Sequence, residues 1–371
     1  PPARAAARME PLLDFCRRAL SPKRGVTLFA ARVALPSAML AFLLSRMQRE
    51  NPDFDVLQFS DDMFGLFSWL LGFMIIFRTS QAYARYLTGA AALLHMCCSF
   101  FEAVCSLTAF VRMSKESPEK VLEFKHTVVR LCSLLSALCM QDISEEGMNS
   151  EIEVIDAVGL DCHALQMLRE SDSRPLLVLH WIMCVIVEGI DSGVLNVPPP
   201  ILGRAFQGMV NGLTHCEDCV HLSVLPFPLP YRQTLLILLI MHWFITPMVA
   251  VQWSARPVLV FFYTFFLVFS YWSLYCISTE LENPFGKDDT DLDVAELQRS
   301  LNRRLLLLLG PAAAWTPRLG ASWSREAAWK VRTPLADLCG DAQDGEGEAH
   351  ALLHKAGPGQ SSPLGLGAMP L

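Results

Sequence analysis

Four stretches of this chain are long and apolar enough, or nearly so, to cross a lipid bilayer, and no other feature constrains its fold as strongly. A membrane helix needs about 20 mostly apolar residues, because a rise of about 1.5 Å per residue must cover a hydrocarbon core about 30 Å thick. The stretches are residues 26–44, 63–77, 234–251 and 257–277. Only residues 252–256 separate the last two, so we expect them to form a helical hairpin through the bilayer.

Composition excludes several alternatives to a membrane protein. Hydrophobic residues make up 52% of the 371 positions and charged residues 18%, whereas soluble chains carry about 25% charged residues. A disordered chain would be poorer in apolar residues, and the 12 cysteines are too few for a disulfide scaffold. The excess of apolar side chains therefore has no place in a water-facing fold.

The orientation of the spans follows from the basic residues beside them. The segment before the first span is rich in basic residues: Arg4, Arg8, Arg17, Arg18, Lys23 and Arg24. The loop between the first two spans is instead rich in Asp and Glu. By the positive-inside rule, the N-terminus faces the side from which insertion occurs, and four spans return the C-terminus to that side.

The region between the second and third spans is predicted to be a helical extramembrane domain. Leu131, Leu134, Leu135 and Leu138 recur at helical spacing, and Pro and Gly residues divide the region into about four helices. The predicted second span ends at Arg78. After residue 310 the chain turns to Gly, Ala, Pro and Ser, which is typical of a flexible tail. The predicted organisation is a basic segment 1–25, two membrane helices in 26–86, the helical domain 87–229, two membrane helices in 230–280, an acidic segment and helix 281–309, and the tail 310–371.

The second span carries an aromatic stripe. Trp69, Phe73 and Phe77 recur every four residues and share one helical face. Ordinary packing against neighbours or lipid would explain such a stripe. Alternatively, small residues among the aromatics let helices approach closely, so the stripe could line the axis of an oligomer and form a hydrophobic constriction.

Two motifs flank the membrane spans and resemble those of the bestrophin family. The family pattern Phe-Arg-Thr, Ala-Tyr, Arg is matched at Phe77, Arg78, Thr79, Ala82, Tyr83 and Arg85, with departures at Ser80, Tyr86 and Leu87. The run Glu-Asn-Pro-Phe-Gly is matched at Glu282, Asn283, Pro284, Phe285 and Gly286. A Pro-rich stretch also precedes the third span. The chain is thereby identified as similar to bestrophins, closer to their microbial and plant-type members, over about residues 20–300.

The resemblance implies a fold and a pore. Bestrophins are all-α pentamers with four membrane helices per subunit, a helical extramembrane domain and one axial pore. Their second helix lines a narrow neck, whose residues correspond here to Trp69, Phe73 and Phe77. This coincidence favours the axis over plain packing. Trp69 is bulkier than the usual aliphatic residue. The resemblance also implies a second constriction near residues 195–197, for which we choose Val197.

The acidic segment 280–293 has two interpretations. It could be a solvated linker whose charges favour the start of the next helix. Animal bestrophins use the corresponding stretch as a calcium clasp, which would place carbonyl ligands at Glu280 and Asn283 and carboxylate ligands at Asp288 and Asp291. Oxygen donors of this kind suit Ca²⁺. Microbial relatives keep similar acids without evident calcium control, so calcium dependence stays open.

The sequence gives only weak indications of a zinc site or of a catalytic site. Cys216 and Cys219 lie beside His215, but structural zinc sites usually need a distant second pair, and buried reduced thiols are favoured instead. We find no nucleophile with a base and no phosphate-binding glycine loop, so the chain is predicted not to be an enzyme and to need no cofactor. No nucleic-acid partner is expected.

The sequence therefore predicts a homopentameric channel for chloride, and by extension bicarbonate or nitrate, embedded in lipid. Two alternatives remain: a cation-conducting relative, and a structural subunit that keeps the fold inside a larger membrane complex. The basic, Ala-rich start resembles the remnant of an organelle transit peptide, which favours a plastid thylakoid membrane over the plasma membrane.

Overall fold

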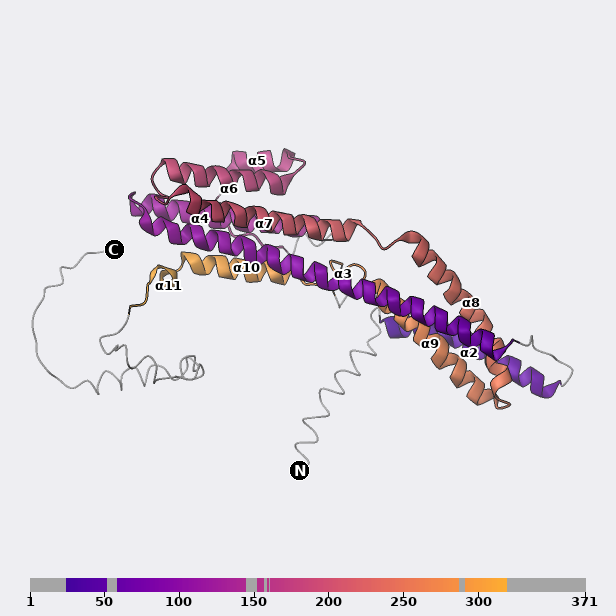
Figure 1. Cartoon of the computed structure of the whole chain (residues 1–371). Helices are drawn as coiled ribbons and strands as arrows, with labels where there is room; N and C mark the ends of the chain where they lie inside the picture. Colours follow the sequence, from indigo (N-terminus) through magenta and orange to yellow (C-terminus); the bar gives the residue numbers. More distant parts are fainter. Residues whose placement is uncertain are drawn as a thin grey trace, which may run out of the picture. The chain divides into compact units, whose positions relative to one another are not determined.

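The computed structural model describes residues 25–51, 59–144, 152–156, 159, 161–286 and 291–318, and its regular elements there are helices without strands (Figure 1). Its helices all belong to one compact unit, Pro1–Ala314; the other is Trp315–Leu371. The helices are α2 (Val26–Glu50), α3 (Asp61–Phe110), η1 (Val111–Met113), α4 (Pro118–Ile143), α5 (Cys162–Glu170), α6 (Arg174–Asp191), α7 (Pro199–Val224), α8 (Leu229–Trp253), α9 (Pro257–Glu280), α10 (Val294–Leu309) and α11 (Pro311–Ala314). This confirms the predicted helical fold class.

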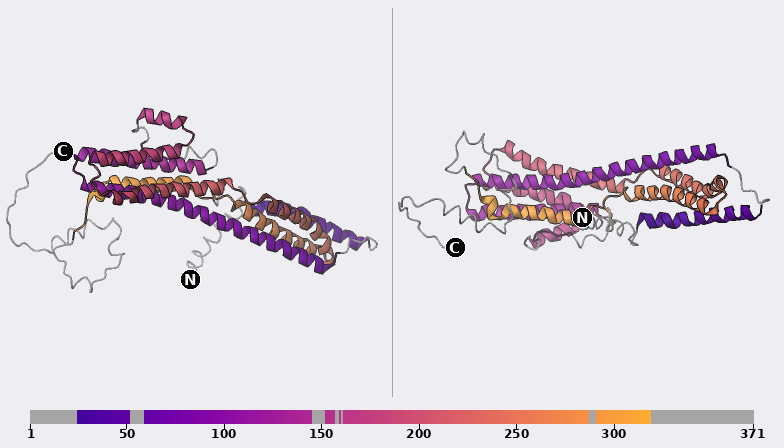
Figure 2. Two further views of the ribbon diagram at one scale, coloured as in Figure 1. Left: turned by 45° about the horizontal axis from the view of Figure 1, so that its top comes forward. Right: turned by 90° about the horizontal axis from the view of Figure 1, so that it is seen from below.

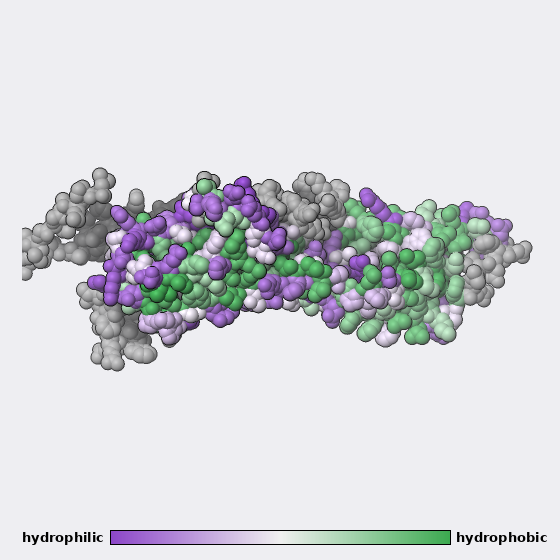
Figure 3. Space-filling model, turned by 90° about the horizontal axis from the view of Figure 1, so that it is seen from above, coloured by the Kyte–Doolittle hydropathy of each residue, from purple (hydrophilic) through white to green (hydrophobic). Residues whose placement is uncertain are grey.

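Four of these helices are long and apolar enough to cross a membrane: α2, α3, α8 and α9. Each contains one of the stretches predicted from the sequence. Hydrophobic side chains gather over the end of the molecule that these helices form (Figure 3). At about 1.5 Å per residue, the 25 residues of α2 extend about 37 Å, enough for a core about 30 Å thick.

The second membrane helix is much longer than its apolar stretch. The apolar stretch ends at Arg78, whereas α3 is one uninterrupted helix of 50 residues from Asp61 to Phe110. Its length of about 75 Å exceeds the bilayer core more than twofold. Arginine is a good helix former, so the helix continues past Arg78, and the Arg78 side chain is buried against Glu282. The predicted boundary after residue 86 consequently falls inside α3.

Small residues allow the membrane helices to pack closely. The face of α2 that packs on α9 and α8 carries fully buried alanines, Ala30, Ala34, Ala38 and Ala41. Such side chains let backbones approach, which is the main route to helix association in lipid. The indole of Trp243 on α8 donates to the carbonyl of Val33 (2.8 Å), and Ser37 donates to the carbonyl of Trp243 (3.0 Å). These bonds fix α2 against α8.

The second half of α3 belongs to the extramembrane bundle. It packs along α7 and contacts α4 and α10, while α6 packs on α4 (Figure 2). Prolines begin α4 and α7 in their first turns, where their missing N–H costs nothing. At Gly212 of α7, an added Cβ would lie 2.3 Å from the Phe100 ring of α3. Only glycine therefore permits this contact.

A buried polar network fixes α10 on α4. Ser133 donates to Asn302 (2.7 Å), Ser136 donates to Gln298 (2.8 Å), and both amides donate to the carbonyl of Glu153. Because unpaired buried polar groups are costly, this network specifies one seating for α10. The helix that follows the acidic segment is thus anchored to the bundle.

Candidate functional site

The aromatic stripe of α3 lies on an exposed face of the subunit. Trp69, Phe73 and Phe77 are 66%, 57% and 45% exposed, whereas Leu71 and Ile75 on the opposite face are fully buried against α8 and α9. The Trp69 and Phe73 rings stack with centroids 5.9 Å apart. Three exposed apolar side chains extend the same surface: Leu66, Leu70 and Ile76. A membrane helix that exposes large aromatic rings on one face and buries the opposite face is suited to line the axis of an oligomer.

Two tyrosines hold this part of α3 in place from behind. The Tyr271 hydroxyl of α9 donates to the carbonyl of Ser68 (2.9 Å), and the Tyr231 hydroxyl of α8 donates to the carbonyl of Met74 (2.7 Å). The Tyr271 ring packs at Gly72, where an added Cβ would lie in ordinary contact, 3.4 Å from its hydroxyl. The aromatic face is therefore carried on a braced helix.

The first turn of α8 contacts the last ring of the stripe, and the Pro-rich loop before α8 contacts that turn. The Phe77 and Tyr231 rings are 6.0 Å apart, and Tyr231 meets Phe227 edge to face at 5.3 Å. The side chain of Phe77 is thus backed by a small aromatic cluster. Aromatic pairs of this geometry contribute about 0.5–1.5 kcal/mol beyond area burial.

Arg78 turns away from the stripe and into the subunit. Its side chain is 1% exposed and its guanidinium donates to Glu282 (3.1 Å) and to Thr279 (3.2 Å). The guanidinium also stacks on the Tyr275 ring at 4.7 Å, a cation–π contact. The other carboxylate oxygen of Glu282 accepts from the backbone N–H of Phe227 (3.0 Å). Sequence reasoning missed Glu282 as the residue that joins α3, the loop and the acidic segment.

The remaining residues of the first motif have separate positions. Arg85 donates to the carbonyls of Leu222 (2.8 Å) and Leu225 (2.7 Å) and so caps the C-terminal end of α7. The Thr79 hydroxyl donates to the carbonyl of Ile75 within α3. Tyr83 is 52% exposed on α3. The structure places Arg78 and Arg85 as structural cations rather than as charges on the aromatic face.

The second motif packs directly on α3. Phe285 is 1% exposed, and both Pro284 and Phe285 lie against Gly89, where an added Cβ would come within 3.0 Å of each ring. The backbone N–H of Phe285 donates to the Asn283 side chain (3.4 Å), and Gly286 is buried. The run 282–286 therefore contacts α3 at two places, near Arg78 and at Gly89.

The predicted calcium ligands are described only in part. Asp288 lies outside the described residues, whereas Glu280, Asn283 and Asp291 lie inside them. In the described ranges no group of three or more His, Cys, Asp and Glu side chains is placed to hold a metal ion. The carbonyl and carboxylate donors of this segment have the chemistry that Ca²⁺ prefers.

Two further predicted positions are buried. Val197, chosen for a second constriction, is 9% exposed and packs in the core of the bundle, whereas Ile201 in the first turn of α7 is 43% exposed. Cys216 and Cys219 are also buried, and their thiols point to backbone carbonyls. Burial raises the pKa of the Cys219 thiol to about 12. A thiol held protonated in this way is a poor metal ligand.

Comparisons with known proteins agree with this fold. A family model described as Bacterial/Fungal Bestrophin protein matches residues 16–306. A voltage-dependent anion channel-forming protein of Synechocystis is 25% identical over 243 residues, 64% of this chain and 74% of the relative, and one of Nostoc is 25% identical over 244 residues with the same coverage. A bacterial bestrophin homolog from Klebsiella pneumoniae has the same fold, with a TM-score of 0.65 at 15% identity over 76% of this chain and 98% of that one. With its four membrane-length helices, the chain is a multi-pass membrane protein.

Proposed function

The chain belongs to the bestrophin family, and we propose that it forms an anion channel whose neck is made by Trp69, Phe73 and Phe77. The observation that carries the proposal is the exposed aromatic face of a membrane helix whose opposite face is buried and braced. The similarity to relatives that are named as anion channel-forming proteins supports the choice of ion.

In a homopentamer, the exposed aromatic face of α3 would line the axis between the subunits. Five copies of α3 around an axis would turn five sets of rings toward each other and remove them from lipid. Narrow apolar constrictions gate ions by dewetting. Ring edges are positive, so edges turned to the axis would partly solvate an anion that has shed water. Chloride is the expected permeant ion.

Neither Arg78 nor Arg85 adds a fixed charge to the proposed neck, because both donate to acceptors inside the subunit. Arg78 follows Phe77 directly, yet it is neutralised by Glu282 inside the subunit. Anion preference would then arise from the rings and from weak binding, which conduction requires. For the second constriction at the far end of the bundle, the exposed Ile201 is a better candidate than Val197, because only its side chain is accessible.

The reversal potential tests the proposed selectivity. The full-length protein is reconstituted in planar bilayers and currents are recorded in a KCl gradient. We expect a reversal potential near the chloride equilibrium value. A value near the potassium equilibrium potential would overturn anion selectivity and support the cation-conducting alternative.

A pair of aromatic substitutions tests the neck. Phe77→Ala removes one ring per subunit from the proposed constriction and is expected to raise the current severalfold, because the apolar barrier to water shortens. The control is Phe266→Ala, which removes a 61% exposed ring from α9. We expect its current to match the unsubstituted protein. Equal currents from all three proteins would contradict the neck assignment.

Particle images decide between a channel and a structural subunit. Five copies around one axis support the channel, whereas a single copy inside a heteromeric complex supports a structural role.

Calcium dependence and a thylakoid location are further parts of the proposal. They are tested by recording currents with and without a calcium chelator, and by imaging a fluorescent fusion in plastid-bearing cells.

A further inference from the structure

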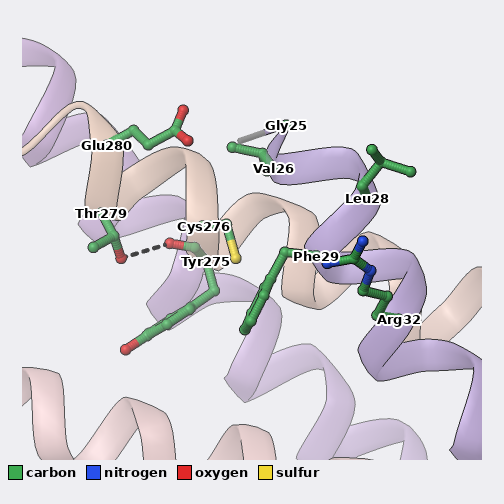
Figure 4. A pocket seen from close by; sticks show the side chains of 9 residues that line it. All are labelled: Gly25, Val26, Leu28, Phe29, Arg32, Tyr275, Cys276, Thr279 and Glu280. Atoms are coloured by element: carbon green, nitrogen blue, oxygen red, sulfur yellow. Dashed lines mark hydrogen bonds between the residues drawn. The ribbon is translucent and has the colours of Figure 1, made fainter. Parts of the chain in front are cut away.

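A pocket of about 450 Å³ lies between the start of α2 and the end of α9, and none of the residues that line it belongs to the proposed neck (Figure 4). The lining is mixed in character: Gly25, Val26, Leu28, Phe29, Arg32, Tyr275, Cys276, Thr279 and Glu280. Both helices are membrane spans, so the pocket lies at the level of one membrane surface.

Arg32 is the unusual member of this lining. It is a charged residue within an apolar span, its side chain is exposed, and it forms no ion pair with any side chain in the described part of the chain. Its Cα lies about 9 Å along the axis from the first residue of α2. For a helix about 37 Å long that is centred upright in a 30 Å core, the overhang is about 3–4 Å at each end, which would place this Cα about 5–6 Å inside the hydrocarbon region.

A cation at that depth needs an anion or a path to water. Charged side chains within membrane spans are costly and usually pair, and long arginine side chains extend toward the headgroup level. The other basic residue in a comparable position, Arg46 near the opposite end of α2, has such a partner in Glu50 (2.6 Å). The Glu280 carboxylate lines the same pocket, but no ion pair joins it to Arg32 in the described part of the chain, so an anion bound in the pocket would supply the counter-charge.

The rest of the pocket suits an amphipathic ligand. Figure 4 shows Phe29 between Arg32 on one side and Tyr275 with Cys276 on the other. Phe29 is 51% exposed and, with Leu28 and Val26, adds apolar surface to the pocket on the side of the helix start. Deeper in the span, Leu35 and Met39 follow Arg32 at helical spacing and are 46% and 50% exposed, so they form an apolar wall beyond the guanidinium. The N-terminal end of α2 has no side-chain cap, and its helix dipole also favours a negative group.

We propose that this pocket binds an anionic glycerophospholipid, with its phosphate on Arg32 and its acyl chains directed into the bilayer along Leu35 and Met39. The planar guanidinium matches phosphate oxygens with paired, charge-assisted hydrogen bonds. A soluble phosphate ester has the same headgroup chemistry. The lipid is favoured because Arg32 lies within the span and because an apolar wall adjoins it.

The test compares two arginines of the same helix. The full-length protein is purified in detergent, titrated with phosphatidylglycerol, and bound lipid is counted by native mass spectrometry. Arg32→Gln is expected to weaken binding by about tenfold or more, as the loss of hydrogen bonds to a charged group predicts. Arg46→Gln removes the same charge at the other end of α2 and is expected to bind like the unsubstituted protein. Arg32→Lys, which keeps the charge, should restore part of the affinity and guards against a folding defect.

Three results would overturn the assignment. Equal lipid binding by Arg32→Gln and the unsubstituted protein would remove Arg32 from the site. Displacement of the lipid by sn-glycerol 3-phosphate at equal concentration would assign the site to a soluble phosphate ester. Phosphatidylcholine binding as tightly as phosphatidylglycerol would remove the requirement for an anionic headgroup. Because the readout is bound lipid rather than current, failure of the channel proposal would leave this measurement unaffected.

Discussion

The two halves of α3 have the same backbone and opposite surfaces. In the membrane half, large rings such as Phe73 are exposed while the charged side chain of Arg78 is buried. In the extramembrane half, Phe100, Met96 and Leu107 are fully buried between α4 and α7. An extramembrane helix hides its rings from water, whereas the membrane half presents rings to other copies, to lipid or to a pore.

This contrast separates the residues of α3 that stabilise the fold from the aromatic residues that are proposed to form the neck. Residues on the extramembrane half of α3 are held by the hydrophobic core of the bundle. Residues on the membrane half are held by a few specific hydrogen bonds from Tyr231 and Tyr271 and by the ion pair with Glu282, which leave the aromatic face unobstructed. Substitutions on the two halves should consequently have different effects.

The largest expected difference is between two phenylalanines of α3. Phe100→Ala opens a cavity in the bundle core and should lower the free energy of unfolding by about 3–5 kcal/mol. Phe73→Ala removes a ring that the subunit does not bury and should cost below about 1 kcal/mol while changing the current. Thermal unfolding in detergent measures the first effect and bilayer recording the second. Comparable destabilisation by both would contradict the division of α3.

The buried ion pair is the next strongest test. Glu282→Ala leaves the Arg78 guanidinium buried without its carboxylate and should cost about 3 kcal/mol, the low end for such pairs, because Thr279 and the Tyr275 ring remain. Glu282→Gln keeps an acceptor for Phe227 and should cost less. Thermal unfolding of the two variants gives the comparison, and an unchanged melting temperature in both would show that the pair contributes nothing to stability.

Two glycines of α7 provide a matched pair. Gly212→Ala forces a Cβ into the Phe100 ring and should destabilise the bundle by about 1–3 kcal/mol. Gly203→Ala meets nothing within 4 Å and should be neutral or stabilising by up to about 1 kcal/mol, as helix propensity predicts. In a Phe100→Ala background the Gly212→Ala penalty should vanish, since the clashing atoms are gone. Persistence of the penalty there would place its cause elsewhere.

The smallest expected effect is a pH dependence confined to the bundle. Hydrogen bonds from Arg130 (2.7 and 3.1 Å) lower the pKa of the Asp156 carboxyl. Its stabilising contribution is therefore present above the unfolded pKa of about 3.9 and is lost as the pH falls through the lower folded value. Asp156→Asn, which tolerates the positive φ at this position, should flatten the fall in melting temperature on acidification below about pH 5. Because the Asp156 carboxylate is 52% exposed, added salt should reduce the difference in melting temperature between the unsubstituted protein and Asp156→Asn. If both proteins lose melting temperature equally on acidification, the role of Asp156 is contradicted.

Much of the fold could be predicted because local patterns determine it. Apolar length gave the four spans, and the spacing of Trp69, Phe73 and Phe77 placed them on one face. The start of α7 followed from its prolines. These features depend on residues close together in the chain.

The rest depends on contacts between distant residues. The burial of Arg78 requires a partner, Glu282, that is 204 residues away. Val197 and Ile201 are both apolar and four residues apart, so only the packing of the bundle decides which one is exposed. The pocket at Arg32 likewise arises where two separate spans meet, and no local pattern of either span indicates it.

The uninterrupted length of α3 makes it a lever. For a rigid rod about 75 Å long, a tilt of about 6° around its middle displaces Phe73, about 19 Å from the middle, by about 2 Å. A displacement of that size is comparable to the radius of a dehydrated ion. Where five such rods surround one axis, rearrangements at the distal end, where α4, α7 and α10 seat the helix, would change the aperture at Phe73 without any change in the neck side chains themselves.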